Sequence, residues 1–333
     1  MKKILAIALA ALMILSLAAC GAQTGAEGGA QGGAQGGAAG KKYTIGICQL
    51  VQHPALDQAT QGFKDAVIAE LGEENVIFEE GNASGDATQC TSIVNGFVAA
   101  KVDLIMANAT PAVAAAYNAT ETIPILGTSV TEYGVALGIK NFSGTVGGNV
   151  SGTSDLADLD KQAQMIIDWC PTAKKVGLLY CSAEANSQYQ VDAVKAYLEG
   201  KGLECKMFAF SDASNMNAVT QEAADWSDAI YVPTDNTVAT YATAINDICQ
   251  PAGVPIIAGE AGICVNCGIA TMSIDYYELG TTTGQMAVRI LRDGEDITKM
   301  PIEYAPNVAL KYNAEICEAL GITPLEGYEK LEG

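Results

Sequence analysis

Positively charged residues are scarce in this sequence, and arginine is almost absent. The chain has 18 lysine and arginine residues against 38 aspartate and glutamate residues, which gives a formal net charge of −20 at pH 7. Because a nucleic-acid-binding surface needs a basic footprint, this balance argues against nucleic acid as a partner. The two arginines, Arg289 and Arg292, fall inside one predicted helix. No predicted loop therefore offers an arginine clamp for a phosphorylated ligand.

The sequence also lacks the common signatures of catalysis. His53 is the only histidine, which leaves little scope for a catalytic triad. No G-x-G-x-x-G motif follows the first predicted strand, and neither a P-loop lysine motif nor a G-x-S-x-G motif is found. We therefore expect a protein that is not an enzyme and that needs no cofactor.

The ten cysteines do not form a regular framework. Setting Cys20 aside leaves nine, an odd number, and Cys48 and Cys181 end apolar runs that suit buried positions. Cys264 and Cys267 form the one close pair, but a single C-x-x-C without a second pair or a nearby histidine is weak evidence for zinc. We predict no metal site, and the redox state of this pair stays open between a disulfide and free thiols.

The first forty residues predict export and anchoring to a membrane. Two lysines precede an apolar run at residues 4–19, which ends in Leu-Ala-Ala before Cys20. This pattern resembles the lipobox of bacterial lipoproteins, so residues 1–19 are predicted to be a signal peptide and Cys20 to carry the lipid that anchors the chain outside the cytoplasm. A plain secretory signal with an incidental cysteine is the alternative. Residues 20–40, mostly Gly, Ala and Gln, are predicted to be a flexible tether.

From residue 41 onward the chain is long and apolar enough for two domains. Strand-like apolar runs alternate with helix-period segments, which predicts an α/β fold with parallel sheets. Helices are predicted after the Pro54 break and near 87–100 and 111–119. The predicted strands lie at 43–50, 76–79, 104–107, 124–126, 176–180, 204–210, 229–232 and 255–257.

These elements divide into two series, which we interpret as two lobes. The first lobe is predicted to comprise residues 41–153 and 276–300, because a helix with Leu279 and Met286 on one face is expected to return the chain to it. The second lobe is predicted to comprise residues 154–275 and 301–333. In parallel sheets of this kind a ligand lies beyond the carboxyl ends of the strands. The loops there lie at 51–57, 108–111, 127–132, 181–187, 233–237 and 258–262.

Short motifs in these loops and in two further segments resemble a known family. They are V-x-H-P-A-L-D at 51–57, A-T-P-A at 109–112, T-x-V-T-x at 128–132, G-T-S-D-L at 152–156, the loop at 181–187, P-T-D-N-T at 233–237 and I-D-Y-Y-E-L-G at 274–280. With them, residues 43–322 resemble the substrate-binding lipoproteins of tryptophan/tyrosine-type ABC transporters. The resemblance implies a type I periplasmic-binding fold, with two Rossmann-like lobes and a three-stranded hinge. It also implies a monomer that closes on an amino acid, often an aromatic one, and delivers it to an ABC permease with a cytoplasmic ATPase.

A zwitterionic amino acid needs hydrogen-bond donors for its carboxylate and an acidic group for its ammonium. Since no arginine is available, we expect the donors to be backbone N–H groups at helix starts and polar side chains of the loops. Asp235 and Asp275 are favoured for the ammonium, ahead of Glu260. The other predicted ligand-binding residues are His53, Thr110, Ser129, Thr131, Asn186, Ser187 and Asn236.

Several of these residues also suit structural roles. Thr110, Ser187 and Asp235 are good helix caps whether or not a ligand binds. His53 either faces the ligand or orders the turn before Pro54. The tyrosines at 133, 189 and 276 offer either stacking surface or the edge of the core.

Two further acids, Asp57 and Asp155, are predicted to lie in first helical turns, where a carboxylate complements the helix dipole. We interpret both as structural. The sequence leaves the exact ligand open, because residues 132–133 and 259–262 depart from the family's usual pattern where the side-chain pocket is expected. An aliphatic amino acid, a nucleobase-like ligand and a sensory role at a receptor remain alternatives.

Overall fold

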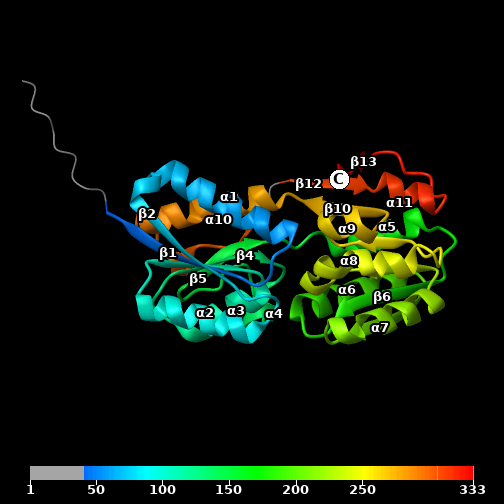
Figure 1. Ribbon diagram of the computed structural model, residues 1–333, viewed down its shortest axis with the longest axis horizontal. Coiled ribbons are helices and arrows are strands. Elements are labelled where there is room, and N and C mark those ends of the chain that lie inside the picture. Colours follow the sequence, from blue (N-terminus) through cyan, green and yellow to red (C-terminus); the bar gives the residue numbers. More distant parts are fainter. Residues whose placement is uncertain (1–40, 306, 333) are drawn as a thin grey trace, which may run out of the picture. The chain divides into compact units, whose positions relative to one another are not determined.

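The computed structural model describes residues 41–305 and 307–332. The predicted signal peptide, Cys20 and the tether lie outside these residues. Within the described ranges, none of the helices combines the length and the apolar character needed to cross a membrane. The described chain forms two sheets, each covered by helices on both faces (Figure 1).

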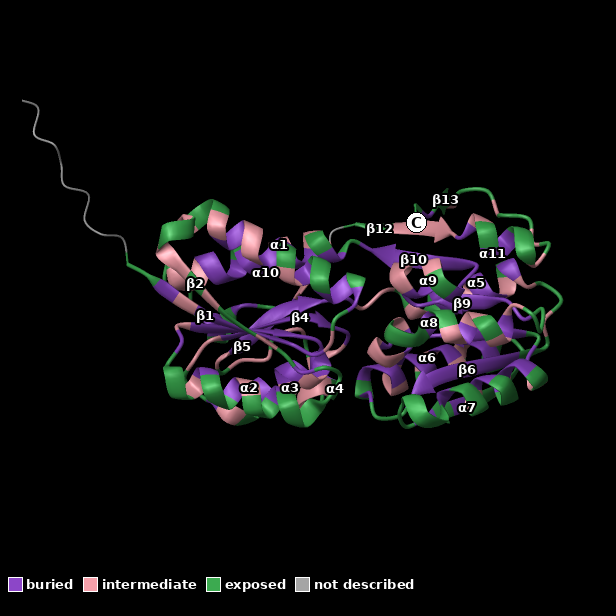
Figure 2. Cartoon of the chain, in the orientation of Figure 1, coloured by how far each residue is buried: buried purple, intermediate pink, exposed green. Residues whose placement is uncertain are grey.

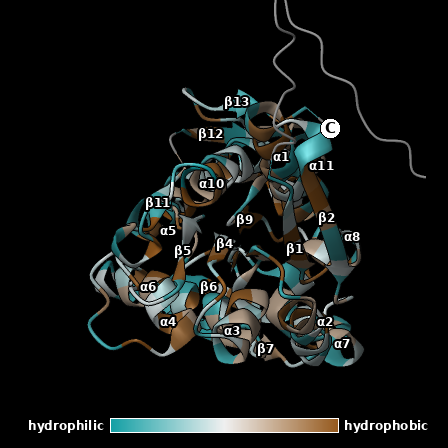
Figure 3. Ribbon diagram, turned by 90° about the vertical axis from the view of Figure 1, so that its left-hand side faces the viewer, coloured by the Kyte–Doolittle hydropathy of each residue, from teal (hydrophilic) through white to brown (hydrophobic). Residues whose placement is uncertain are grey.

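The first sheet has the strand order β11-β5-β4-β3-β1-β2, and all its neighbouring strands are parallel. Successive side chains of β1 point to opposite faces of the sheet and pack against different helices. Ile45 and Ile47 pack toward α1 and α10, whereas Cys48 packs toward α2 and α3. In Figure 3 the strands lie between the layer that holds α1 and α10 and the layer that holds α2 and α3. The strands are β1 (Tyr43–Gln49), β2 (Val76–Asn82), β3 (Leu104–Asn108), β4 (Ile125–Val130), β5 (Val150–Ser154) and β11 (Glu303–Tyr304). The helices are α1 (Pro54–Leu71), α2 (Ala87–Ala100), α3 (Thr110–Ala119), α4 (Tyr133–Leu137) and α10 (Tyr276–Leu291), with 3₁₀ turns at Glu73–Asn75 and Ile297–Lys299.

The second sheet has the order β13-β12-β10-β9-β8-β6-β7 and is parallel except where β12 runs antiparallel to β10. Its core side chains come from α5, α6 and α11 on one face and from α7, α8 and α9 on the other. Figure 2 shows the buried strands between helices whose outer surfaces are exposed. The strands are β6 (Lys175–Cys181), β7 (Glu204–Phe210), β8 (Ala229–Val232), β9 (Ile256–Ala258), β10 (Ala270–Ile274), β12 (Val308–Tyr312) and β13 (Glu329–Lys330). The helices are α5 (Leu159–Trp169), α6 (Ala185–Gly200), α7 (Ala213–Trp226), α8 (Asn236–Cys249), α9 (Ala261–Cys267) and α11 (Ala314–Ala319).

Within the described residues the chain crosses between the sheets three times: after β5, between β10 and α10, and between β11 and β12. Helix α10 packs on α1 of the first sheet through glycines, since a Cβ on Gly280 would lie 2.0 Å from the carbonyl oxygen of Ala59. Strand β11 pairs with β5. The placement of residues 301–304 in the second lobe was therefore wrong, because the chain leaves the first sheet only after Tyr304.

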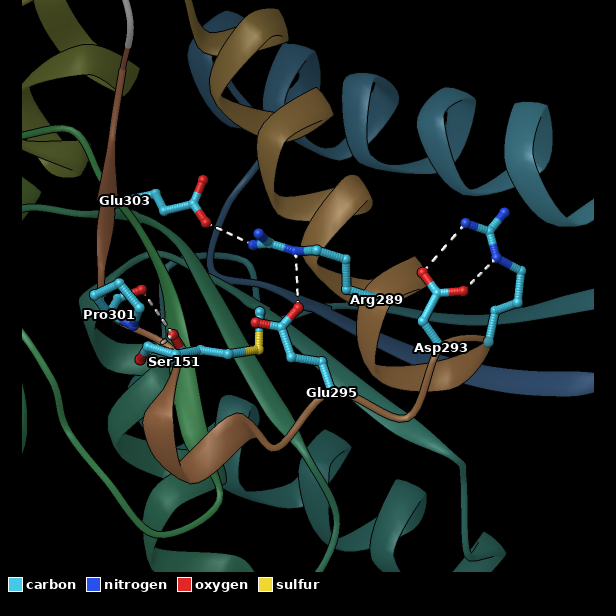
Figure 4. Close-up of polar contacts among 8 residues, drawn as sticks. Ser151, Arg289, Asp293, Glu295, Pro301 and Glu303 are labelled. Atoms are coloured by element: carbon cyan, nitrogen blue, oxygen red, sulfur yellow. Dashed lines mark hydrogen bonds and ion pairs between the residues drawn. The ribbon is translucent and has the colours of Figure 1, made fainter.

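Polar contacts fix the segment that leads to the third crossing (Figure 4). Arg289 of α10 forms ion pairs with Glu295 and with Glu303 of β11. The hydroxyl of Ser151 donates to the carbonyl oxygens of Met300 and Pro301 over 3.1 and 3.2 Å. Helix α10 and strand β5 thereby hold β11 at the edge of the first sheet.

Two predictions about local structure were wrong for identifiable reasons. Strand β4 continues to Val130, four residues beyond the predicted end, because Gly127 and Val130 still pair with β5 on either side of a register shift. Asp155 lies just after β5 and outside any helix, since α5 begins only at Leu159. Asp57, by contrast, lies in the first turn of α1 as expected.

Candidate functional site

The loops at the carboxyl ends of the two sheets enclose a small polar pocket with a free volume of about 10 Å³. That volume is room for about one water molecule. The pocket is closed by residues of both sheets and of two crossing segments. Its lining residues are His53, Leu56, Ser129 and Thr131 from the first lobe, Asp155 after β5, Tyr276 at the start of α10, and Asn186, Thr234, Asp235, Asn236, Ala239 and Glu260 from the second lobe.

Three buried polar atoms in this lining have no hydrogen-bond partner among the described residues. They are Oγ of Ser129, Oδ1 of Asp155 and Oδ1 of Asn186, and each side chain is at most 6% exposed. A buried polar atom left unpaired costs about 1–3 kcal/mol. Three such atoms in one pocket therefore mark a place built to pair with a polar group from outside the chain.

Asp155 is the most distinctive of these groups. The hydroxyl of Tyr276 donates to its Oδ2 over 2.9 Å, whereas its Oδ1 remains free. Burial raises the pKa of this carboxyl to about 6, the hydroxyls of Tyr276 and Thr131 and its own backbone N–H oppose that rise, and the charge of Glu260 adds to it. An approaching positive charge would stabilise the ionised form that burial disfavours.

Ser129 reaches the pocket through an unusual backbone. Its φ angle is +54°, in the left-handed region, and it lies within the register shift between β4 and β5. Residues other than glycine seldom adopt this conformation, and such positions cluster at binding sites. Ser129 therefore lines the pocket from an irregular point of β4.

The other two acids in the pocket already bind backbone groups. Asp235 accepts from the N–H of Val238 at the start of α8 and from the N–H of Cys181, over 2.8 and 2.7 Å. Glu260 accepts from two N–H groups at the start of α9, both over 2.6 Å. Burial raises the pKa of both carboxyls. The helix starts of α8 and α9 are thus occupied by the protein's own carboxylates, contrary to the expectation that helix starts would receive a ligand carboxylate here.

One polar contact joins the two sides of the pocket. Nε2 of His53, in the loop before α1, lies 3.2 Å from Oδ1 of Asn236, the first residue of α8. His53 makes no side-chain capping bond to α1. Its clearest partner is therefore a residue of the other sheet.

The structure brings seven of the ten predicted ligand-binding residues to the pocket and leaves three outside its lining. Thr110 is buried as the first residue of α3, and Ser187 is buried in the first turn of α6. Asp275 is exposed and caps α10 by accepting from the N–H of Glu278 over 2.9 Å, so the favoured role of this residue has no support from its position.

Asp155 is the residue that sequence reasoning missed, because it was taken for a first-turn acid. The signal that pointed to it was its place in the G-T-S-D-L motif. Tyr276 was considered as stacking surface or as the edge of the core, whereas its hydroxyl donates to Asp155. Leu56, Thr234 and Ala239 were not singled out. Cys264 and Cys267 are both buried free thiols, and among the described residues no group of three or more metal-binding side chains comes together.

Two mostly parallel α/β sheets, three crossing segments and a polar pocket between facing strand ends define a two-lobed binding protein of the type I periplasmic-binding fold. This confirms the predicted fold class. The chain belongs to the ABC transporter substrate binding protein family, whose model matches residues 44–330. Proteins of this family are extracytoplasmic binding components that work with a permease, and the family is not one of enzymes.

Known proteins support this assignment. A tyrosine-binding protein of Clostridioides difficile (strain R20291) is 35% identical over 288 residues, which cover 86% of this chain and 83% of that protein. The structure of an ABC domain in complex with L-Trp, from Streptococcus pneumonia, has a TM-score of 0.83 at 30% identity and covers 88% of this chain and all of that chain. The ligand-free, open structure of a substrate-binding protein with adhesive properties, from Clostridium difficile, has a TM-score of 0.67 at 36% identity and covers 87% of this chain and 99% of that chain.

The two solved structures differ in how closely they superimpose on this protein. The L-Trp complex superimposes better, although its sequence is less similar than that of the ligand-free, open structure. The present structure therefore resembles the arrangement of a ligand-bound relative more than that of an open one.

Proposed function

We propose that this protein captures an aromatic amino acid outside the cytoplasm, closes on it by hinge motion and delivers it to an ABC permease. The observation that carries the proposal is the buried Asp155 carboxylate, with one oxygen paired and the other free in the pocket. The relatives described as binding tyrosine and L-Trp support the aromatic class.

The unpaired atoms suit an ammonium group. An alkylammonium has three N–H donors and no acceptor. The two free carbonyl-type oxygens, Oδ1 of Asp155 and Oδ1 of Asn186, accept hydrogen bonds, and the Ser129 hydroxyl accepts as well. Asp155 also supplies the charge that an ammonium requires in a buried site. This assignment replaces Asp235 and Asp275 as the favoured ammonium partners.

Hinge motion follows from where these atoms originate. Ser129 belongs to β4 of the first lobe, Asp155 to a crossing segment and Asn186 to α6 of the second lobe. A ligand that contacts all three favours the arrangement in which they are close together, so its binding energy shifts the equilibrium toward closure. The free volume of about 10 Å³ also requires the walls to separate before an amino acid can enter.

A ligand screen tests the proposal. The processed chain would be heated with aromatic amino acids, aliphatic amino acids, nucleosides, sugars and polyamines, and any ligand that raises the melting temperature would be titrated by calorimetry. A ligand at 100 times its Kd adds about 2.7 kcal/mol of stability. We expect tyrosine, tryptophan or phenylalanine to act and to be recovered unchanged. Stabilisation only by a compound without an ammonium group would contradict the assignment of Asp155.

We further propose that a lipid on Cys20 holds the protein at the membrane, because Leu-Ala-Ala before this cysteine resembles a lipobox. Cells expressing the protein would be labelled with radioactive palmitate. The wild type and a Cys170→Ala control are expected to carry the label, and Cys20→Ala is expected to lack it. Equal labelling of Cys20→Ala would contradict the anchor.

A further inference from the structure

The contact between His53 and Asn236 spans the pocket from one sheet to the other. Apart from bonds made by the crossing segments, it is the one side-chain hydrogen bond among the described residues that joins the two sides. His53 is buried and lines the pocket together with Asn236. Any opening of the pocket along this side must break the contact.

Glu184 determines how Asn236 is oriented. Its Oε2 accepts from the side-chain Nδ2 of Asn236 over 2.7 Å and from the backbone N–H of the same residue over 3.0 Å. Its Oε1 accepts from the N–H and hydroxyl of Thr237 over 2.9 and 2.8 Å. Since Nδ2 is engaged by Glu184, Oδ1 of Asn236 faces His53, and the imidazole must donate its Nε2 hydrogen.

Asn236, one partner of the contact, borders two spaces. It lines the polar pocket and also a groove of about 410 Å³, which Glu184 lines as well. The groove is formed by both lobes, with Leu50, Val51 and Pro111 on one side and Thr237 and Tyr241 on the other. Asn236 therefore lies where the groove meets the pocket.

We propose that His53 and Asn236 form a gate between the outer groove and the ligand pocket, with Glu184 as its positioning residue. The gate rests on the proposed function, because it assumes that an amino acid enters this pocket. Its closure slows the departure of bound ligand. Glu184 also accepts from Nδ2 of Asn186 over 3.3 Å, so the gate adjoins the proposed ammonium site. His53 and Asn236 thus retain bound ligand by binding each other.

The rate of ligand release tests the gate. The wild-type protein would be loaded with L-tyrosine or L-tryptophan and mixed rapidly with an excess of competing ligand, and the dissociation rate constant would be measured. Asn236→Ala and His53→Leu remove one side of the contact and are expected to raise this constant on the order of tenfold, the effect of one buried hydrogen bond. Glu184→Gln is expected to raise it less, since one amide oxygen still accepts.

Two variants separate the gate from a general loss of structure. His53→Gln keeps an N–H donor and is expected to release ligand more slowly than His53→Leu, because the donor restores part of the contact with Asn236. Asn246→Ala removes an amide from the same helix, where its Nδ2 bonds only to Gln250, and is expected to leave release unchanged. Wild-type release rates in both Asn236→Ala and His53→Leu would overturn the gate.

The release measurement distinguishes failure of the gate from failure of the proposed function. If the wild type binds neither amino acid, the proposed ligand class is wrong, and the gate, which assumes that ligand, is wrong with it. If the wild type binds and both Asn236→Ala and His53→Leu release ligand at its rate, the gate is wrong and the proposed function stands.

Discussion

The hydroxyl of Tyr276 donates to Oδ2 of Asp155 over 2.9 Å, and Oδ1 of the same carboxylate has no partner among the described residues. The two residues come from different crossing segments, one after β5 and one at the start of α10. The hydrogen bond therefore links the segment after β5 to the start of α10 beside the pocket. A ligand that pairs with Oδ1 would therefore contact one of the segments that connect the two lobes.

Replacing Asp155 should weaken ligand binding strongly. Asp155→Asn keeps the size and removes the charge, so we expect the Kd for the bound amino acid to rise on the order of 100-fold, since breaking a buried charge pair costs about 2–5 kcal/mol. Calorimetry measures the change. Asp275→Asn is the matched control, because Asp275 is exposed and asparagine also caps a helix well. Equal losses in the two variants would argue against the assignment of Asp155.

Binding should also depend on pH near 6. Burial raises the pKa of Asp155 to about 6 in the ligand-free protein, and an ammonium requires the ionised form. Affinity is therefore constant above pH 7 and falls as the pH decreases through 6, and binding at pH 6 releases a proton. Calorimetry in two buffers of different ionisation enthalpy detects this proton, and Asp155→Asn should not release it.

The free energy of unfolding of the ligand-free protein should increase as the pH decreases, whereas the affinity for ligand decreases. A raised pKa means that the folded state binds the proton more tightly than the unfolded chain, so acidification from pH 7 to pH 4 adds up to about 3 kcal/mol from Asp155. Asp235 and Glu260 act in the same direction. The difference between the wild type and Asp155→Asn in denaturant unfolding isolates the contribution of Asp155, and a constant difference across this pH range would contradict it.

Asp235 should matter for folding more than an ordinary helix cap. Asp235→Ala leaves two buried N–H groups without their acceptor, those of Val238 and Cys181, so we expect a loss of about 2–4 kcal/mol. Asp212→Ala removes an exposed cap of α7 and should cost about 1 kcal/mol. Urea unfolding of both variants provides the comparison. A loss in Asp235→Ala no greater than in Asp212→Ala would mean that the Cys181 contact adds nothing.

The packing of α10 on α1 should tolerate no added methyl group at Gly280. In Gly280→Ala the new Cβ would lie 2.0 Å from the backbone oxygen of Ala59, which is far inside contact distance, so we expect a loss of at least about 3 kcal/mol. Gly96→Ala provides the control. No atom lies within 4 Å of a Cβ at that helical position, so alanine should stabilise by about 0.5–1 kcal/mol. A neutral Gly280→Ala would show that the helices separate easily.

The strands that sequence reasoning found differ physically from those it missed. β8 is a continuous apolar run and β1 is largely apolar, which is the pattern of strands buried on both faces. β5 has the sequence V-S-G-T-S and β10 the sequence A-T-M-S-I, and both are completely buried. Their small and polar side chains suit burial only because neighbouring strands and helices supply partners, as when Thr153 bonds to Thr283 over 2.8 Å.

The sequence by itself determined the alternation of strands and helices, the loops that would face a ligand and the family. Each depends on neighbours along the chain, such as periodicity, helix breakers and short motifs. Only the tertiary structure decided which acidic side chain keeps an unpaired oxygen in the pocket. Asp235 and Glu260 are occupied by backbone N–H groups, Asp275 is exposed, and Asp155 keeps one free oxygen beside Tyr276, 121 residues away in sequence. Such differences arise from burial and from hydrogen-bond partners distant along the chain, which local sequence patterns do not encode.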